Sequence, residues 1–291
     1  MERIIVGIDA ESASELAIEW VIRRARHTTL AVTLVTAIDS LVDDPPTARD
    51  RQLALAERIR LVHPGLDIKT ELADASIHRA LEERSKDADL LVIGSHRTRP
   101  IRSLLAGEVS SLIASRAHCP TVIVPDDWTP CDGAIVVGLG MDDTSEPAML
   151  FGVREAQRRS SILKLVHASL EGDSAAHREI LDAAGRRLRA GHPHARILEQ
   201  LVNGRATDAL LAESDSAELV VIGTHHHEPA VGLILGSASS HLLRRSRVPV
   251  CIVPDTGDRL VEDPAGVEHN WAAGIGDADV RVLDPLGLGR L

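Results

Sequence analysis

The chain repeats itself, and the repeat limits the folds that it can adopt. The segment IIVGIDAESASELA, which starts at Ile4, returns as IVVGLGMDDTSEPA from Ile135, 131 positions later. Further along, DLLVIGSH returns as ELVVIGTH and CPTVIVP returns as VPVCIVP, both 129 positions later. Each copy, at about 130 residues, has the usual size of a domain, so we expect two tandem domains of one fold.

Each copy alternates strand-like and helix-like segments. Several strand-like runs of the first copy are continuous in Val, Ile and Leu, which is typical of parallel strands covered on both faces. The five runs are 3–8, 31–38, 66–72, 90–94 and 121–124. Helical patterns lie between the strands, for example from Ser12 onward, over 47–62 and over 174–190. The alternation predicts an α/β fold in which each copy is a doubly wound, five-stranded parallel sheet of the Rossmann-like class.

The domain boundaries are expected where the periodicity breaks. The segment PDDWTPCDG, from Pro125 to Gly133, interrupts the pattern before the second copy begins. We therefore expect the first domain over 1–127 and the second over 128–255. Residues 256–291 have no counterpart in the first copy, and their Pro, Gly and Asp residues indicate a disordered or surface-packed tail.

Composition argues against several classes of function. The chain carries 43 Asp and Glu against 32 Lys and Arg, and its net charge of −11 opposes binding to nucleic acid. One Phe, three Trp and no Tyr also leave few aromatic faces on which bases could stack. Three cysteines without CxxC spacing fit a reduced compartment, and no signal peptide or membrane span is recognisable. We expect a cytoplasmic protein that binds neither nucleic acid nor membrane.

The loops that follow the first and fourth strands of each copy are the expected ligand site. In an open parallel sheet, ligands bind beyond the carboxyl ends of the strands where the strand order reverses, and these two strands are neighbours there. In the second copy, Gly236, Ser237 and Ser239 stand at the start of a helix in this region. Glycine lets an anion approach the backbone, and free amides and hydroxyls can donate to phosphate oxygens. The same residues also fit ordinary helix capping.

With these motifs the chain resembles a tandem universal stress protein over residues 1 to 254. The resemblance lies in the VGID, DLLVIGSH and GSASS segments and in the closing VPVCIVP strand. It implies an adenine nucleotide alpha hydrolase-like fold and a regulatory role in the stress response. Members of this family that bind ATP carry the pattern G-x2-G-x9-G-[ST] after the fourth strand and an Asp at the end of the first, which implies ATP, with Mg²⁺, as the ligand.

Neither copy carries the whole pattern. The first copy matches it at Asp9, Gly94, Gly107 and Ser110. It has Arg97 at the second glycine and Glu108 at the Ser/Thr position. The second copy matches it at Gly223, Gly236, Ser237 and Ser239. It has His226 at the second glycine and Gly140 in place of the aspartate.

The two defects differ in their expected cost. A carboxylate at Glu108 would repel the phosphates by about 4 kcal/mol at about 4 Å and an effective dielectric near 20. Gly140 in place of the aspartate removes only one or two hydrogen bonds to the base, which corresponds to roughly 1–3 kcal/mol of binding free energy. We therefore expect the second half to be the better nucleotide site, with His226 as an added donor. Neutralisation of Glu108 by Arg97, Arg99 and Arg102 is the alternative that would preserve the first site.

The sequence suggests three alternative functions. A metal site is suggested by the run from His225 to Glu228 with His192, His194 and His241, but adjacent loop residues rarely all face one ion, so we expect none. An enzyme is not expected, beyond slow ATP hydrolysis, because no Walker or Gly-x-Ser-x-Gly motif is present. The last alternative is an interaction module of the same fold that binds no nucleotide.

The expected partners follow from the repeat and from the family resemblance. Members of the family resemble dimers built through their closing strands, which implies that 121–124 and 250–253 pair in the same way within one chain, as an intramolecular pseudo-dimer, with a homodimer as a further level of association. An adenine nucleotide is the expected small ligand. A protein partner is expected from the regulatory role, but the sequence does not identify it.

Overall fold

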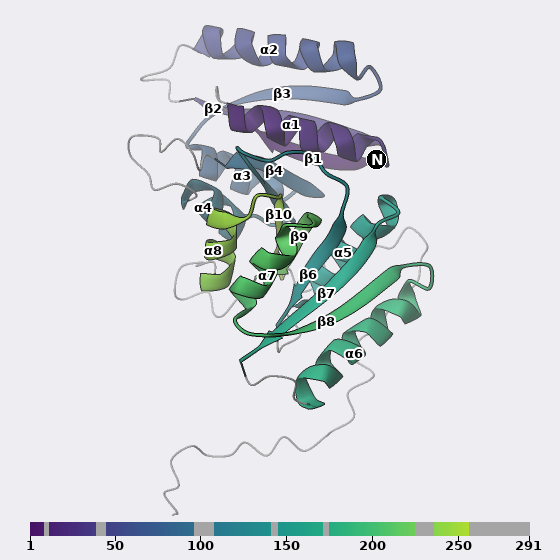
Figure 1. Ribbon diagram of the computed structural model, residues 1–291. Helices are drawn as coiled ribbons and strands as arrows, with labels where there is room; N and C mark the ends of the chain where they lie inside the picture. Colours follow the sequence, from purple (N-terminus) through teal and green to yellow (C-terminus); the bar gives the residue numbers. More distant parts are fainter. Residues whose placement is uncertain are drawn as a thin grey trace, which may run out of the picture. The chain divides into compact units, whose positions relative to one another are not determined.

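The computed structural model describes residues 1–8, 12–38, 45–95, 108–140, 145–170, 175–224 and 236–255 (Figure 1). These residues belong to one compact unit, Met1–Thr256. The expected tail from 256 onward lies outside the described residues. None of the helices in the described part of the chain is long and apolar enough to cross a membrane.

Strands and helices alternate in both halves, as the sequence predicts (Figure 1). The first half contains β1 Glu2–Gly7, α1 Ser12–Ala25, β2 Leu30–Ile38, α2 Pro45–Val62, β3 Asp67–Asp74, α3 Ile77–Ser85, β4 Leu90–Ser95, α4 Glu108–Arg116 and β5 Thr121–Pro125. The second half contains β6 Ala134–Leu139, α5 Glu146–Arg158, β7 Ile162–Ser169, α6 Ala175–Gly191, β8 Arg196–Asn203, α7 Ala206–Ser214, β9 Ala217–Gly223, α8 Ser237–Arg245 and β10 Val250–Val253. The expected ends are shifted by one or two residues, the usual uncertainty of such boundaries.

Each half is a parallel sheet whose strand order reverses at its first strand. The order is β3-β2-β1-β4-β5 in the first half, and the second half repeats it as β8-β7-β6-β9-β10. β1 pairs with both β2 and β4, and β6 pairs with both β7 and β9. The crevice between the first and fourth strands, where a ligand is expected, is therefore present in both halves.

The two sheets join edge to edge through β5 and β10. This pair is antiparallel, with Val250 opposite Ile123, Cys251 opposite Val122 and Ile252 opposite Thr121. Cys251 and Val122 occupy the same position of the repeat, so the register is symmetric about this pair. One ten-stranded sheet results. The expected pairing of the closing strands within the chain is confirmed, and the halves form an intramolecular pseudo-dimer.

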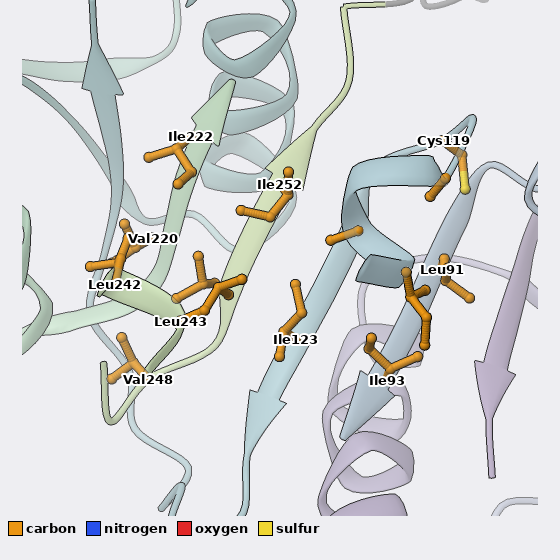
Figure 2. Close-up of a cluster of buried hydrophobic side chains, with 14 of the residues drawn as sticks. Leu91, Ile93, Cys119, Ile123, Val220, Ile222, Leu242, Leu243, Val248 and Ile252 are labelled. Atoms are coloured by element: carbon orange, nitrogen blue, oxygen red, sulfur yellow. The ribbon is translucent and has the colours of Figure 1, made fainter. Parts of the chain in front are cut away.

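The hydrophobic core continues across this junction. One cluster of buried side chains contains Leu91, Ile93 and Ile123 from the first half with Ile222 and Ile252 from the second (Figure 2). Helices α3, α4, α7 and α8 all contribute residues to this cluster, so they cover the same face of the sheet. Because apolar burial is the main stabilising term, a shared core explains why the halves behave as one unit.

A glycine repeated at the end of the first strand is explained by packing. A Cβ at Gly7 would lie 2.9 Å from Leu81 Cδ1, and a Cβ at Gly138 would lie 2.9 Å from Leu210 Cδ1. Both leucines are buried, on α3 and α7 respectively. The glycine of the VGID motif therefore lets a helix pack closely on the strand.

The three cysteines give a prediction about thiol reactivity. Cys119 and Cys251 are buried and Cys131 is exposed, and none is in a disulfide. Burial raises the pKa of Cys119 to about 12 and raises that of Cys251 well above its usual value. Only a thiolate reacts rapidly, so a maleimide should modify one thiol in the native protein and three after unfolding. Mass spectrometry counts the adducts; rapid native modification of Cys119 or Cys251 would contradict the buried placement.

Candidate functional site

The crevice of the second half lies where β6 and β9 end side by side. The two strands are parallel neighbours, so Leu139 and Gly223 end at the same edge of the sheet. Gly223 is held in the sheet opposite Val253 of β10, and the Thr224 amide donates to the Val253 carbonyl at 3.0 Å. The chain therefore leaves β9 from a fixed point before it returns to start α8.

Helix α8 presents free backbone donors at its start. Gly236 is the N-cap residue, and the first backbone bond of the helix runs from the Ser240 amide to the Gly236 carbonyl at 3.0 Å. Within the described part of the chain, no acceptor is found for the amides of residues 237–239. Such amides carry the positive end of the helix dipole and are suited to an anion.

Gly236 is not required by the protein's own packing. Its φ of −54° is open to any residue, and a Cβ built there would have no atom of the described residues within 4 Å. The residue is exposed. In contrast to Gly138, which packs against a leucine, Gly236 is not packed against any described residue, and a glycine at this place would let a ligand approach the backbone.

The hydroxyls of the two equivalent serines differ. Ser110 of α4 donates to the Gly94 carbonyl at 3.5 Å, the outer limit for a hydrogen bond, which brings two expected site residues of the first half together. Its counterpart Ser239 is 8% exposed, and the described residues include no partner for its hydroxyl. In the second half this donor is therefore available to a ligand.

The other wall of the second crevice contains Gly140, which stands in place of the aspartate of the motif, and further residues that the sequence did not single out. The Gly140 amide donates to Ser145 Oγ at 2.8 Å, which ties the end of β6 to the start of α5. The Leu139 carbonyl lies 3.0 Å from His167 Nδ1, and His167 Nε2 lies 2.9 Å from His177 Nδ1. With Nδ1–H donating to the carbonyl, His167 accepts at Nε2 from His177. The sequence signals for this wall were Gly140 and the serine shared by the repeated segments, Ser14 in the first copy and Ser145 in the second; nothing in the sequence marked His167 and His177.

The first half has a different helix start. α4 begins at Glu108, so a carboxylate residue stands at the position of Ser237. Nearby, Ser95 at the end of β4 is 2% exposed, and its hydroxyl has no partner among the described residues. The first crevice thus contains the buried Ser95 hydroxyl, which has no partner among the described residues, and an acidic residue, Glu108, at the start of the helix.

Several expected site residues lie outside the described part of the chain. They are Asp9, Gly107 and His226, together with Arg97, Arg99 and Arg102. Their roles stay predictions. Of the expected site residues, the structure describes Gly94, Ser110, Gly223, Gly236, Ser237 and Ser239, with Ser237 described at its backbone.

Two of the histidines named for the metal hypothesis have other partners. His192 Nδ1 lies 3.1 Å from Gln157 Oε1, and His241 Nε2 lies 3.4 Å from an Arg245 nitrogen. In the described ranges, no group of three His, Cys, Asp or Glu side chains could hold a metal ion. The run from His225 to Glu228 lies outside those ranges.

A cavity of about 630 Å³ opens at the opposite edge of the sheet. It lies between the end of α1 and the starts of β6, β7, β8 and β9. In its lining, Arg23 pairs with Asp132 at 3.0 Å and Arg159 pairs with Glu218. Because ligands of open parallel sheets bind at the carboxyl ends of strands, this cavity at the amino ends is a feature of the junction between the halves.

Comparisons with known proteins agree with the repeat. A model of the universal stress protein family matches residues 1–125 and again residues 133–254. A universal stress protein of Mycolicibacterium smegmatis is 28% identical over 283 residues, which cover 86% of this chain and 96% of that protein. Universal stress protein Rv2623 of Mycobacterium tuberculosis is 27% identical over 286 residues, which cover 87% and 96%.

Solved structures show the same fold. A universal stress protein from Archaeoglobus fulgidus matches with a TM-score of 0.66 at 18% identity and covers 87% of this chain and 98% of its own. A putative universal stress protein from Pseudomonas aeruginosa matches with a TM-score of 0.60 at 16% identity, with coverages of 87% and 93%. The α/β fold of two tandem domains is confirmed.

Proposed function

Because the chain belongs to the universal stress protein family, we propose that it is a regulatory protein that binds ATP at the start of α8. The observation that carries this proposal is the set of amides at residues 237–239, which have no acceptor among the described residues, beside a glycine with no described atom near its Cβ position. Three amides and the Ser239 hydroxyl provide donors for the phosphates.

The second half is the preferred nucleotide site because its helix begins with a serine, whereas the helix of the first half begins with a glutamate. Ser237 adds a neutral donor, whereas the equivalent Glu108 adds a negative charge at a distance where repulsion of phosphate is about 4 kcal/mol. The intact crevice wall of the second half, with Gly140 tied to Ser145, would face the nucleoside. His226 is proposed as an additional phosphate donor, and Mg²⁺ as a companion of ATP.

We propose binding with at most slow turnover. The second-half motif supplies amides and hydroxyls that position phosphate, but Gly223 and residues 236–239 include no carboxylate that could activate water or hold Mg²⁺. Binding of ATP would then regulate the protein through a protein partner in the cytoplasm.

We propose that the two universal stress protein domains span residues 1–127 and 128–255.

The serine and the glutamate at the helix starts provide a reciprocal test. Calorimetric titration of the full chain with ATP and Mg²⁺ should show one site per chain. Ser237→Glu should weaken that site at least tenfold, since it brings the carboxylate of the first half into the second. Glu108→Ser should add a second, weaker site. Unchanged binding in Ser237→Glu would contradict the assignment, and no binding in any protein would favour the interaction module without a nucleotide.

A further inference from the structure

One buried position of the repeat faces its own counterpart across the junction. Arg24 of α1 and Glu155 of α5 are 131 positions apart, the same separation as Ile4 and Ile135. They are therefore equivalent residues in the two halves. Each is 1% exposed, and Arg24 Nη1 forms an ion pair with a Glu155 carboxylate oxygen.

The symmetry of the sheet explains why equivalent residues meet. α1 packs on β4 and β5, and α5 packs on β9 and β10. Because β5 and β10 pair symmetrically about Val122 and Cys251, α1 and α5 are brought together in the same way. In such a two-fold arrangement, a residue near the axis contacts the same position of the other half.

Each member of the pair also binds charged residues of its own half. The remaining donors of Arg24 bind Glu2, with Nη2 at 2.7 Å and Nε at 3.1 Å from its oxygens. Glu155 also accepts from Arg158 at 3.0 Å and from Arg159 at 3.4 Å. The ring of Trp20 lies 5.6 Å from the Arg24 guanidinium and 5.3 Å from that of Arg159. The acceptor for Arg24 Nη1 therefore comes from the facing half, where it is Glu155.

We propose that the charge at this position decides which halves can join through β5 and β10. A first half joins a second half, whereas two first halves or two second halves do not join. Two first halves joined in the same way would place Arg24 against Arg24 in a buried site. Two second halves would place Glu155 against Glu155. Like charges that are buried face to face oppose such an association, whereas the tandem chain brings opposite charges together.

The proposal limits how this protein can assemble. The joining edges of β5 and β10 are both used inside one chain, so a second chain has no free copy of this surface. A further subunit would have to bind elsewhere. The partner fitted to the joining surface is thus the opposite half of the same repeat, selected by charge.

Single charge reversals reproduce each rejected pairing inside the full chain. Arg24→Glu places two carboxylates face to face, and Glu155→Arg places two guanidinium groups face to face. Each should lower the folding equilibrium constant, measured by urea unfolding, at least 100-fold, as expected when a buried pair is broken. The neutral double variant Arg24→Gln/Glu155→Gln keeps similar volumes without charge, and it should be at least tenfold more stable than either reversal.

The exposed pair of Arg58 and Glu15 provides the control. Both of its side chains are 64% exposed, so Arg58→Glu should change the equilibrium constant less than about fivefold. If either reversal at 24 or 155 is as stable as the neutral double variant, like charges are tolerated and the proposal is wrong. A reversal that does not fold, while the neutral double variant folds, supports it.

Discussion

A protein with Gly236→Ser is expected to fold as stably as the wild type and to lose most of its affinity for ATP. Serine is a favoured N-cap residue, and the observed φ of −54° suits it, so the free energy of unfolding should stay equal or rise by a few tenths of a kcal/mol. The serine oxygen would accept the amides of the first turn and occupy the space over which phosphate passes. We expect the dissociation constant to rise at least tenfold.

This substitution is expected to lower the affinity for ATP without lowering the stability of the fold. Thermal unfolding and calorimetric titration with ATP should be measured on the same preparation. Gly65→Ser is the matched control, because a Cβ there also has no atom within 4 Å and the residue lies before β3, far along the chain from the crevice. Equal affinity in both variants would show that the start of α8 does not bind the phosphates.

Acid should destabilise the protein through Glu155. Burial disfavours the charged carboxylate, but Arg24, followed by Arg159, outweighs burial and lowers the pKa to about 2 from a usual 4.5. A depressed pKa contributes stability above the unfolded value, and this contribution is lost as the pH falls from 4.5 towards 2. The shift corresponds to roughly 3 kcal/mol.

Glu155→Gln isolates this contribution from that of other carboxylates. Its amide cannot ionise, so the variant should be less stable than the wild type at pH 7 by about 3 kcal/mol. The difference between the two proteins should shrink steadily below pH 4.5. Urea unfolding monitored by circular dichroism at several pH values measures it. A difference that stays constant down to pH 2.5 would mean that Glu155 keeps an ordinary pKa.

Much of the fold followed from the sequence because two independent patterns agreed. The apolar runs gave the strands, and the 131- and 129-residue repeat showed that both halves share one topology. The pairing of 121–124 with 250–253 was predicted from the resemblance to family members that are dimers through their closing strands, together with the presence of two such strands in one chain.

The cooperation between side chains could not be predicted in this way. Arg24 and Glu155 are unremarkable charged residues in two helical patterns, and their pairing follows only from the symmetric register of β5 and β10. Likewise, His167 and His177 lie in different elements, and neither belongs to the histidine run that drew the metal interpretation. The structure also assigns the glycine of VGID to helix packing, which a motif alone does not distinguish from a ligand contact.

The most direct test of nucleotide binding at the start of α8 is to follow backbone amides by NMR while ATP is added to the full chain. Hydrogen bonds from the amides to phosphate should move the signals of Ser237, Ala238 and Ser239 more than any others in the described elements, and Glu108 to Ser110 should move little. Large shifts at α4, or at the cavity between α1 and β6, with α8 unchanged would contradict the proposed site.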